Sequence, residues 1–122
     1  MTATILIVEN HAPLRLALRW WLENNFPRYQ VIEAADEVEA MALVQAGSPQ
    51  MIVMDVGSPG INDLASTRRI KTMAPTIPIV VLTSYDSEAH RLSATAAGAS
   101  ACVSKGSIQT ELQLTLARLL FS

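Results

Sequence analysis

Polar and charged side chains follow four strongly hydrophobic runs, and their types are those that phosphoryl chemistry uses. In chain order they are Glu9 with Asn10, Asp55, Thr83 and Lys105. A carboxylate can attack phosphorus when a cation offsets the repulsion between two anions, and a hydroxyl or an ammonium group can then bind the phosphoryl oxygens. In a parallel sheet covered by helices on both faces, ligands bind outside the carboxyl ends of the strands. We therefore expect these side chains to gather at one edge of a sheet.

The elements that must position these groups alternate between strand and helix patterns. Strands are predicted over residues 1–8, 29–34, 51–55, 79–82 and 101–104, and helices over 13–25, 37–45, 64–73, 88–97 and 108–120. The predicted helix caps are Asp36, Asn62 or Asp63, and Ser107. The second strand has polar flanks and is expected at a sheet edge. Five βα units predict the α/β class with a doubly wound, five-stranded parallel sheet.

Length and composition predict one domain over residues 1–122. Half of the 122 residues are hydrophobic, which is enough for a substantial core. The net charge of -2, with Lys and Arg scattered, predicts no direct contact with nucleic acid. Cys102 is the only cysteine, so no disulfide can form within the chain. Neither a signal-peptide pattern nor a long apolar span is present, and a cytoplasmic protein without membrane contact is expected.

Four segments together resemble the response-regulator receiver domains of two-component signalling. They are I-L-I-V-E-N-H at the start, M-D-V-G-S-P-G around Asp55, L-T-S at Thr83, and A-G-A-S-A-C-V-S-K-G-S ending beyond Lys105. The resemblance spans essentially the whole chain, and its opening and ending are most similar to receivers of the LuxR and NarL type. It implies the flavodoxin-like (βα)5 receiver fold. It also implies a signalling module that catalyses at most its own phosphorylation and dephosphorylation.

The resemblance implies a role for each of the singled-out residues. Asp55 would accept a phosphoryl group from a histidine kinase or phosphotransfer protein, Lys105 would pair with Asp55 and then with the phosphoryl group, and Thr83 would move inward after phosphorylation. Mg²⁺ would be bound by the positions of Glu9, Asn10 and Asp55 and by the backbone carbonyl of Gly57. On the residues alone, Asp55 could instead cap a turn, Lys105 could be a solvated lysine, and Thr83 could bond locally.

Two departures from the family pattern alter these expectations. Receivers usually end the first strand with two acidic residues, whereas Asn10 offers only a neutral carbonyl oxygen, so weakened Mg²⁺ binding is expected. Glu9 and Asp55 contribute -2 and Lys105 contributes +1, which leaves -1 at the resting site. Cys102 replaces the usual Tyr or Phe, and without that aromatic partner the movement of Thr83 is expected to shift the following helix only slightly.

Several alternatives and partner surfaces follow from the remaining residues. A flavin carrier is disfavoured because the segment after the first strand lacks glycine, and an aspartate phosphatase because Gly57 replaces a second Asp. A pseudo-receiver, an interaction module that works without phosphorylation, stays open. Leu16 and Trp20 could form an apolar patch for docking or a homodimer, or they could belong to a broad buried face with Trp20 flat on the surface. A DNA-binding output domain could follow if the chain is a fragment. His90 is expected to be a solvated helix residue.

Overall fold

Five parallel strands form the single sheet of the computed structural model, which describes residues 3–47, 49–56, 64–84 and 87–121. The strands are β1 (Thr4–Val8), β2 (Gln30–Ala34), β3 (Met51–Asp55), β4 (Ile79–Thr83) and β5 (Ala101–Ser104). Their spatial order is β2-β1-β3-β4-β5, which places β2 at an edge as expected. The five predicted strands are confirmed, except that β1 begins at Thr4 and residues 1–2 of its predicted range lie outside the described residues. Every residue of β3 and β4 is buried, because helices cover both faces of the sheet.

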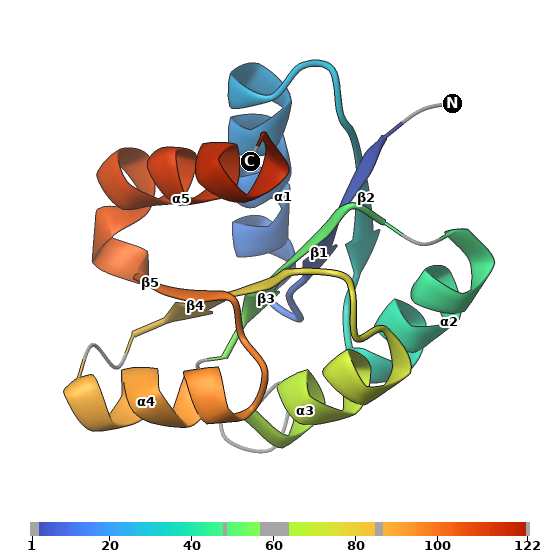
Figure 1. The fold of residues 1–122 in the computed structure, drawn as a ribbon. Coiled ribbons are helices and arrows are strands. Elements are labelled where there is room, and N and C mark those ends of the chain that lie inside the picture. Colours follow the sequence, from blue (N-terminus) through green and yellow to red (C-terminus); the bar gives the residue numbers. More distant parts are fainter. Residues whose placement is uncertain (1–2, 48, 57–63, 85–86, 122) are drawn as a thin grey trace.

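Helices cover the sheet in two layers (Figure 1). Helices α1 (Ala12–Asn25) and α5 (Gln113–Leu120) lie on one face, and α2 (Glu37–Gly47), α3 (Leu64–Met73) and α4 (Glu88–Ala96) lie on the other. Alternate strand residues supply two separate cores, since side chains of a strand point to opposite faces in turn. Val53 packs in the core under α1 and α5, and Met54 packs in the core under α2, α3 and α4. The doubly wound α/β fold is confirmed.

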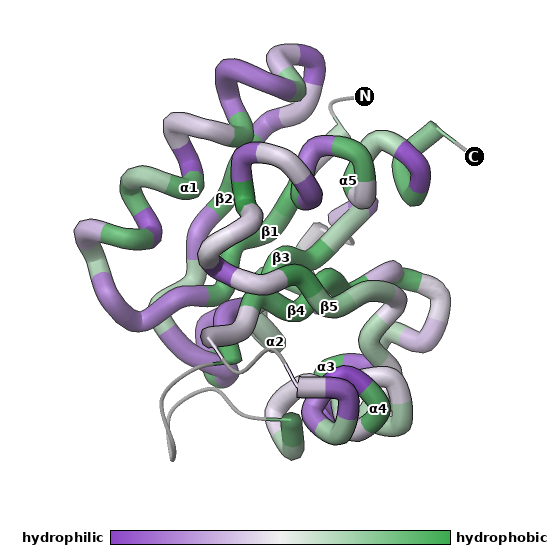
Figure 2. The backbone as a smooth tube through the Cα atoms, turned by 90° about the vertical axis from the view of Figure 1, so that its left-hand side faces the viewer, coloured by the Kyte–Doolittle hydropathy of each residue, from purple (hydrophilic) through white to green (hydrophobic). Residues whose placement is uncertain are grey.

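Hydropathy follows this layering along the chain. Figure 2 shows β3, β4 and β5 in hydrophobic colours at the centre, while α1 alternates between hydrophobic and hydrophilic turns. The buried side of α1 contains Leu18 and Leu22, and its outer side exposes Leu16 and Trp20. Among the described residues, no helix combines the length and the apolar character that crossing a membrane requires.

Side-chain caps explain where several helices begin. The Asp36 carboxylate accepts the Glu39 N–H at 2.9 Å, as predicted, and the Ser87 hydroxyl accepts the His90 N–H at 3.1 Å at the start of α4. Gly98 follows α4 with a φ of +107°, a conformation that favours glycine, and so ends this helix. The predicted caps of α3, Asn62 and Asp63, lie outside the described residues.

The predicted cap of the last helix was wrong. Ser107 makes no capping hydrogen bond, because the chain turns helical earlier, in a 3₁₀ turn, η1 (Lys105–Ser107), that Ser104 caps through the Gly106 N–H at 3.3 Å. A π-helical turn, η2 (Ile108–Leu112), then leads into α5. Ser104 therefore takes the role expected of Ser107, and Lys105 stands in the first turn after β5. This placement aims the Lys105 side chain back over the end of the sheet.

Candidate functional site

Asp55 and Lys105 form an ion pair at the carboxyl end of the sheet. Asp55 is the last residue of β3 and is buried, and the Lys105 Nζ lies 2.7 Å from its Oδ2. β5 is separated from β3 only by β4, so the long lysine side chain can span the intervening strand end. The predicted pairing of these two groups is present. A buried carboxylate of this kind needs a cationic partner, since an unpaired charge in the interior is costly.

Glu9 brings a second buried carboxylate to the same place. It directly follows β1, the other neighbour of β3, and only 2% of its surface is exposed. Its Oε1 accepts the His11 N–H at 3.0 Å. Its Oε2 and the Oδ1 of Asp55 are both buried and have no hydrogen-bond partner among the described residues while both groups are ionised. Two carboxylate oxygens left in this state require either a shared proton or a cation.

Burial and the nearby Asp55 strongly favour the protonated form of Glu9. Loss of solvent contact, then a hydrogen bond and charge repulsion with Asp55, raise the pKa of Glu9 to about 8, against the smaller opposing effects of the His11 N–H and of Lys105. In the metal-free protein this raised pKa favours a proton on Glu9 at neutral pH. That proton can bridge the two carboxylates and satisfy both otherwise unpaired oxygens.

The donor set fits a hard divalent cation only in part. Mg²⁺ prefers carboxylate oxygens and water, and Glu9 and Asp55 supply two carboxylates in contact. Asn10 stands next to them but is exposed. Gly57, the predicted carbonyl ligand, lies outside the described residues. No group of three His, Cys, Asp or Glu side chains at metal-binding distances occurs in the part of the chain that the structure describes.

Thr83 ends β4 beside Asp55 and is completely buried. Asp55 pairs with Leu82 in the sheet register, and the Val56 N–H donates to the Leu82 carbonyl at 2.8 Å, so Thr83 is one residue further along the adjacent strand. Its Oγ1 lies 3.1 Å from the Nε2 of His90, which comes from the first turn of α4. The expectation that His90 is simply solvated was wrong. The sequence contained only a slight indication of the contact between His90 and Thr83, namely a polar ring in the first turn of the helix that follows the Thr83 strand.

Arg15 is another residue near the site that the sequence did not single out. Its guanidinium donates to the Glu9 carbonyl at 2.7 Å and to the Glu33 carboxylate at 3.1 Å. Arg15 thereby ties α1 to the end of β1 and to β2. The guanidinium of Arg19 binds the same Glu33, and these two arginines lower the pKa of Glu33. This network fixes the backbone that carries Glu9, whereas it leaves the Glu9 carboxylate to face Asp55.

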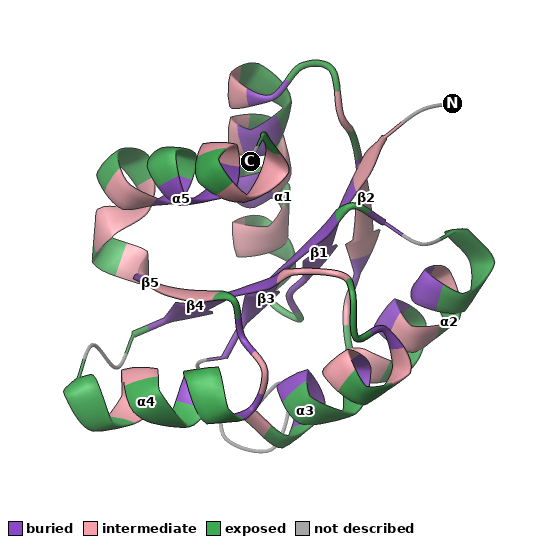
Figure 3. Ribbon diagram, viewed as in Figure 1, coloured by how far each residue is buried: buried purple, intermediate pink, exposed green. Residues whose placement is uncertain are grey.

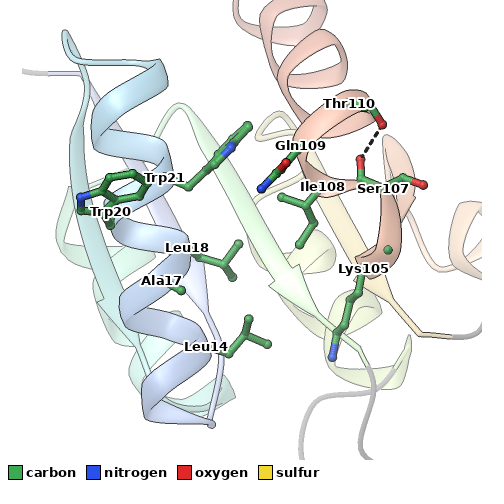
Figure 4. Close-up of a pocket in the computed structure, with 11 residues that line it drawn as sticks. Leu14, Ala17, Leu18, Trp20, Trp21, Lys105, Ser107, Ile108, Gln109 and Thr110 are labelled. Carbon is green, nitrogen blue, oxygen red and sulfur yellow. Dashed lines mark hydrogen bonds between the residues drawn. The ribbon is translucent and has the colours of Figure 1, made fainter.

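A groove of about 510 Å³ between α1 and η2 adjoins the site. Figure 4 shows Leu14, Leu18 and Trp21 of α1 facing Ile108 across it, with the Lys105 side chain at one end. Trp20 is 66% exposed and Leu16 is 65% exposed, so the predicted apolar patch on α1 lies open. Of the two patch residues Trp20 also lines the groove, and Lys105 at the end of the groove pairs with Asp55.

Comparison with known proteins agrees with this architecture. The response regulator receiver domain family matches residues 5–117. The chain is 34% identical over 99 residues to the response regulator MprA of Mycobacterium bovis (strain BCG / Pasteur 1173P2), covering 81% of this chain and 42% of that protein. A crystal structure of a two-component response regulator of the LuxR family from Aurantimonas sp. SI85-9A1 has a TM-score of 0.87 and 35% identity, covering 98% of this chain and 86% of that one.

A structure of the chemotaxis protein CheY4 of Vibrio cholerae has a TM-score of 0.85 and 26% identity, covering 98% of this chain and all of that one. The chain therefore belongs to the response regulator receiver domain family, and it is a receiver domain of two-component signalling. The resemblance drawn from the sequence is confirmed. The chain spans about two fifths of the length of the curated relatives that it matches.

Proposed function

We propose that Asp55 accepts a phosphoryl group from a histidine kinase or a phosphotransfer protein. The observation that carries the proposal is the buried Asp55 carboxylate held at 2.7 Å by Lys105, with the Glu9 carboxylate beside it. These three groups come from three different strand ends. Their convergence on one point is hard to explain by stability alone, because buried charged clusters rarely stabilise a fold better than apolar packing does.

In the transfer step, an oxygen of Asp55 forms a bond to phosphorus while the bond between phosphorus and the donor nitrogen breaks, and the donor leaves with that electron pair. Lys105 balances the charge of the carboxylate before transfer and of the phosphoryl oxygens afterwards. Thr83 offers a hydroxyl donor from the adjacent strand. A bound Mg²⁺ would supply charge neutralisation for the transferred group. Glu9 and Asp55 would hold the ion, and Asn10 would weaken its binding.

The proposed role is that of a signalling module with no separate substrate. A phosphoryl group on Asp55 would change the surface presented to partners. The chain matches less than half of its curated relatives' length, and two similar structures are named as DNA-binding response regulators, so a DNA-binding output domain is a candidate recipient of the signal. The exposed patch of Leu16 and Trp20 is a candidate face for a docking partner or a second copy of the chain.

The experiment compares the parent with Asp55→Asn after incubation with acetyl phosphate and Mg²⁺, using mass spectrometry of the intact protein and of its peptides. We expect one phosphoryl group on the peptide that contains Asp55 and none in Asp55→Asn. Glu23→Gln, which changes an exposed carboxylate of α1, serves as the control and should be labelled like the parent. Labelling of Asp55→Asn at the parent level would refute the proposal, and absence of labelling in the parent would favour the pseudo-receiver.

A further inference from the structure

Cys102 stands where receivers usually carry an aromatic partner for the threonine. In this chain Thr83 contacts His90. We propose that His90 is the positioning residue through which the state of Asp55 reaches α4. In the resting state His90 holds the Thr83 hydroxyl toward α4. When Asp55 carries a phosphoryl group, Thr83 turns its hydroxyl toward that group, and the hold on α4 is released. This inference rests on the proposed phosphorylation of Asp55.

The pleat of the sheet places the resting Thr83 hydroxyl on the α4 face. Val81 packs in the core under α2, α3 and α4, and Thr83, two residues later on the same strand, points to the same face. Asp55, by contrast, follows Val53 on the opposite face. The 3.1 Å contact between Thr83 Oγ1 and His90 Nε2 is the result. To meet a group bound to Asp55, the hydroxyl must rotate away from His90 and over the end of the sheet.

When His90 carries its proton on Nδ1, its Nε2 accepts the Thr83 proton, and in that tautomer a phosphoryl oxygen on Asp55 competes for the same proton. The phosphoryl oxygen is favoured, because a hydrogen bond to an ionised oxygen is roughly twice as strong as one between neutral groups. Thr83 is completely buried, so its hydroxyl needs a partner in either state. Rotation about one side-chain bond can exchange one partner for the other. The backbone of β4 need not move for the exchange to take place.

α4 is suited to respond because few apolar contacts hold it. Of its nine residues only Ala94 is buried, and most of its surface is exposed in Figure 3. Polar contacts between α4 and the sheet are therefore a large part of what holds this helix in place. His90 ties it to β4, and the guanidinium of Arg91 donates to the Cys102 carbonyl of β5 at 2.8 Å. Elements with little buried apolar surface open at low free-energy cost.

This reasoning revises the expectation from Cys102 that α4 responds little. Cys102 is partly buried and packs against the core under α4, but its side chain is too small to follow Thr83. The imidazole of His90 comes instead from the helix itself. Release of the His90 contact therefore acts on α4 directly and needs no rotating residue in β5.

The test measures amide hydrogen exchange of residues 91–97 in the parent, His90→Leu and His90→Gln, each with and without beryllofluoride and saturating Mg²⁺. Gln can place a polar atom near the position of the imidazole Nε2, and Leu cannot. Ser93→Ala, an exposed change on the same helix, is the matched control. The ¹⁵N shift of the His90 Nε2 is recorded in the parent, because a purely structural role would leave it unchanged when Asp55 is modified.

We expect beryllofluoride to raise exchange across α4 of the parent about fivefold, the change that corresponds to one neutral hydrogen bond, and to shift the His90 Nε2 resonance. His90→Leu should exchange about fivefold faster at rest and respond little further. His90→Gln and Ser93→Ala should follow the parent. In a Thr83→Val background, His90→Leu should have almost no additional effect.

The proposal is overturned if a parent that binds beryllofluoride shows no change in α4 and no shift of His90. It is equally overturned if His90→Leu keeps the full response of the parent. In either case labelling of Asp55 would still stand. A parent that is neither labelled by acetyl phosphate nor able to bind beryllofluoride would instead refute the phosphoacceptor function, and the switching role of His90 with it.

Discussion

Glu9→Gln should make the metal-free protein more stable at alkaline pH than the parent. The pKa of Glu9 is raised from 4.5 to about 8 in the folded protein. Between these values the folded state binds more protons than the unfolded state does, so the free energy of unfolding falls as the pH rises. The stabilisation from protonated Glu9 is complete below pH 4.5, is lost progressively through the window, and is gone above about pH 8.

The size of the effect follows from the shift. A displacement of 3.5 units, from 4.5 to about 8, corresponds to an upper limit of about 5 kcal/mol at 1.36 kcal/mol per unit. Because the neighbouring charges of Asp55 and Lys105 act on Glu9 in opposite directions, we expect only about 2–3 kcal/mol of this to appear between pH 5 and pH 8. Gln stays neutral throughout, its oxygen can accept the His11 N–H, and its amide can donate to Asp55 Oδ1, so this part of the pH dependence should disappear.

The assay is urea unfolding of the parent, Glu9→Gln and the control Glu23→Gln at several pH values, with the metal chelated. Other groups titrate in the same range, so the quantity of interest is the difference between parent and variant at each pH. For Glu9→Gln this difference should grow from pH 5 to pH 8, and for Glu23→Gln it should stay flat. A constant difference for Glu9→Gln would show that Glu9 is already ionised at neutral pH and would refute the shared proton.

Two further predictions concern the metal and the fold. Asn10→Asp should bind Mg²⁺ about fivefold more tightly, which corresponds to about 1 kcal/mol for one added charge at a partly screened distance. Calorimetry would measure the two affinities, and equal values would show that residue 10 does not contact the ion. Gly98→Ala should cost about 1–3 kcal/mol in urea unfolding, because φ is +107° and a Cβ would lie 2.6 Å from Lys71 Cγ. Gly47→Ala, where nothing lies within 4 Å of an added Cβ, should change stability far less, and similar losses at both positions would contradict the strain argument.

The parts of the fold that sequence patterns predicted well are those set by burial on two faces. Central parallel strands need apolar residues on both sides, so β1, β3 and β4 appear as unbroken hydrophobic runs. Once the strands are placed, their ends must meet at one edge, which brings Asp55 and Lys105 near each other; the pairing itself was implied by the family resemblance. These conclusions depend on local pattern and topology, which one sequence contains in full.

The parts that sequence patterns missed depend on distances between groups from different elements. Ser107 has the residue type of a cap, but Ser104 caps an earlier turn. His90 has no charged neighbour pattern that marks it, and only the packing of α4 on β4 brings its ring to Thr83. The raised pKa of Glu9 depends on its burial and its approach to Asp55. Residue type and spacing do not determine the Ser104 cap, the contact between His90 and Thr83, or the burial of Glu9 beside Asp55.

Protonation of Glu9 changes the net charge of the site, and so does Asn10, where receivers usually carry an acidic residue. With Glu9 ionised, Glu9 and Asp55 at -2 and Lys105 at +1 leave -1; with Glu9 protonated at neutral pH, Asp55 at -1 and Lys105 at +1 leave a neutral site. A neutral resting site repels an anionic phosphoryl donor less, but it also attracts a divalent cation less. If Glu9 binds Mg²⁺ as proposed, the ion would have to displace this proton, and Mg²⁺ affinity would then rise with pH. Under the proposed function, Asn10 and the buried Glu9 would both weaken metal binding, and the charge of Lys105 would carry more of the stabilisation of the transferred group than it would beside three ionised carboxylates.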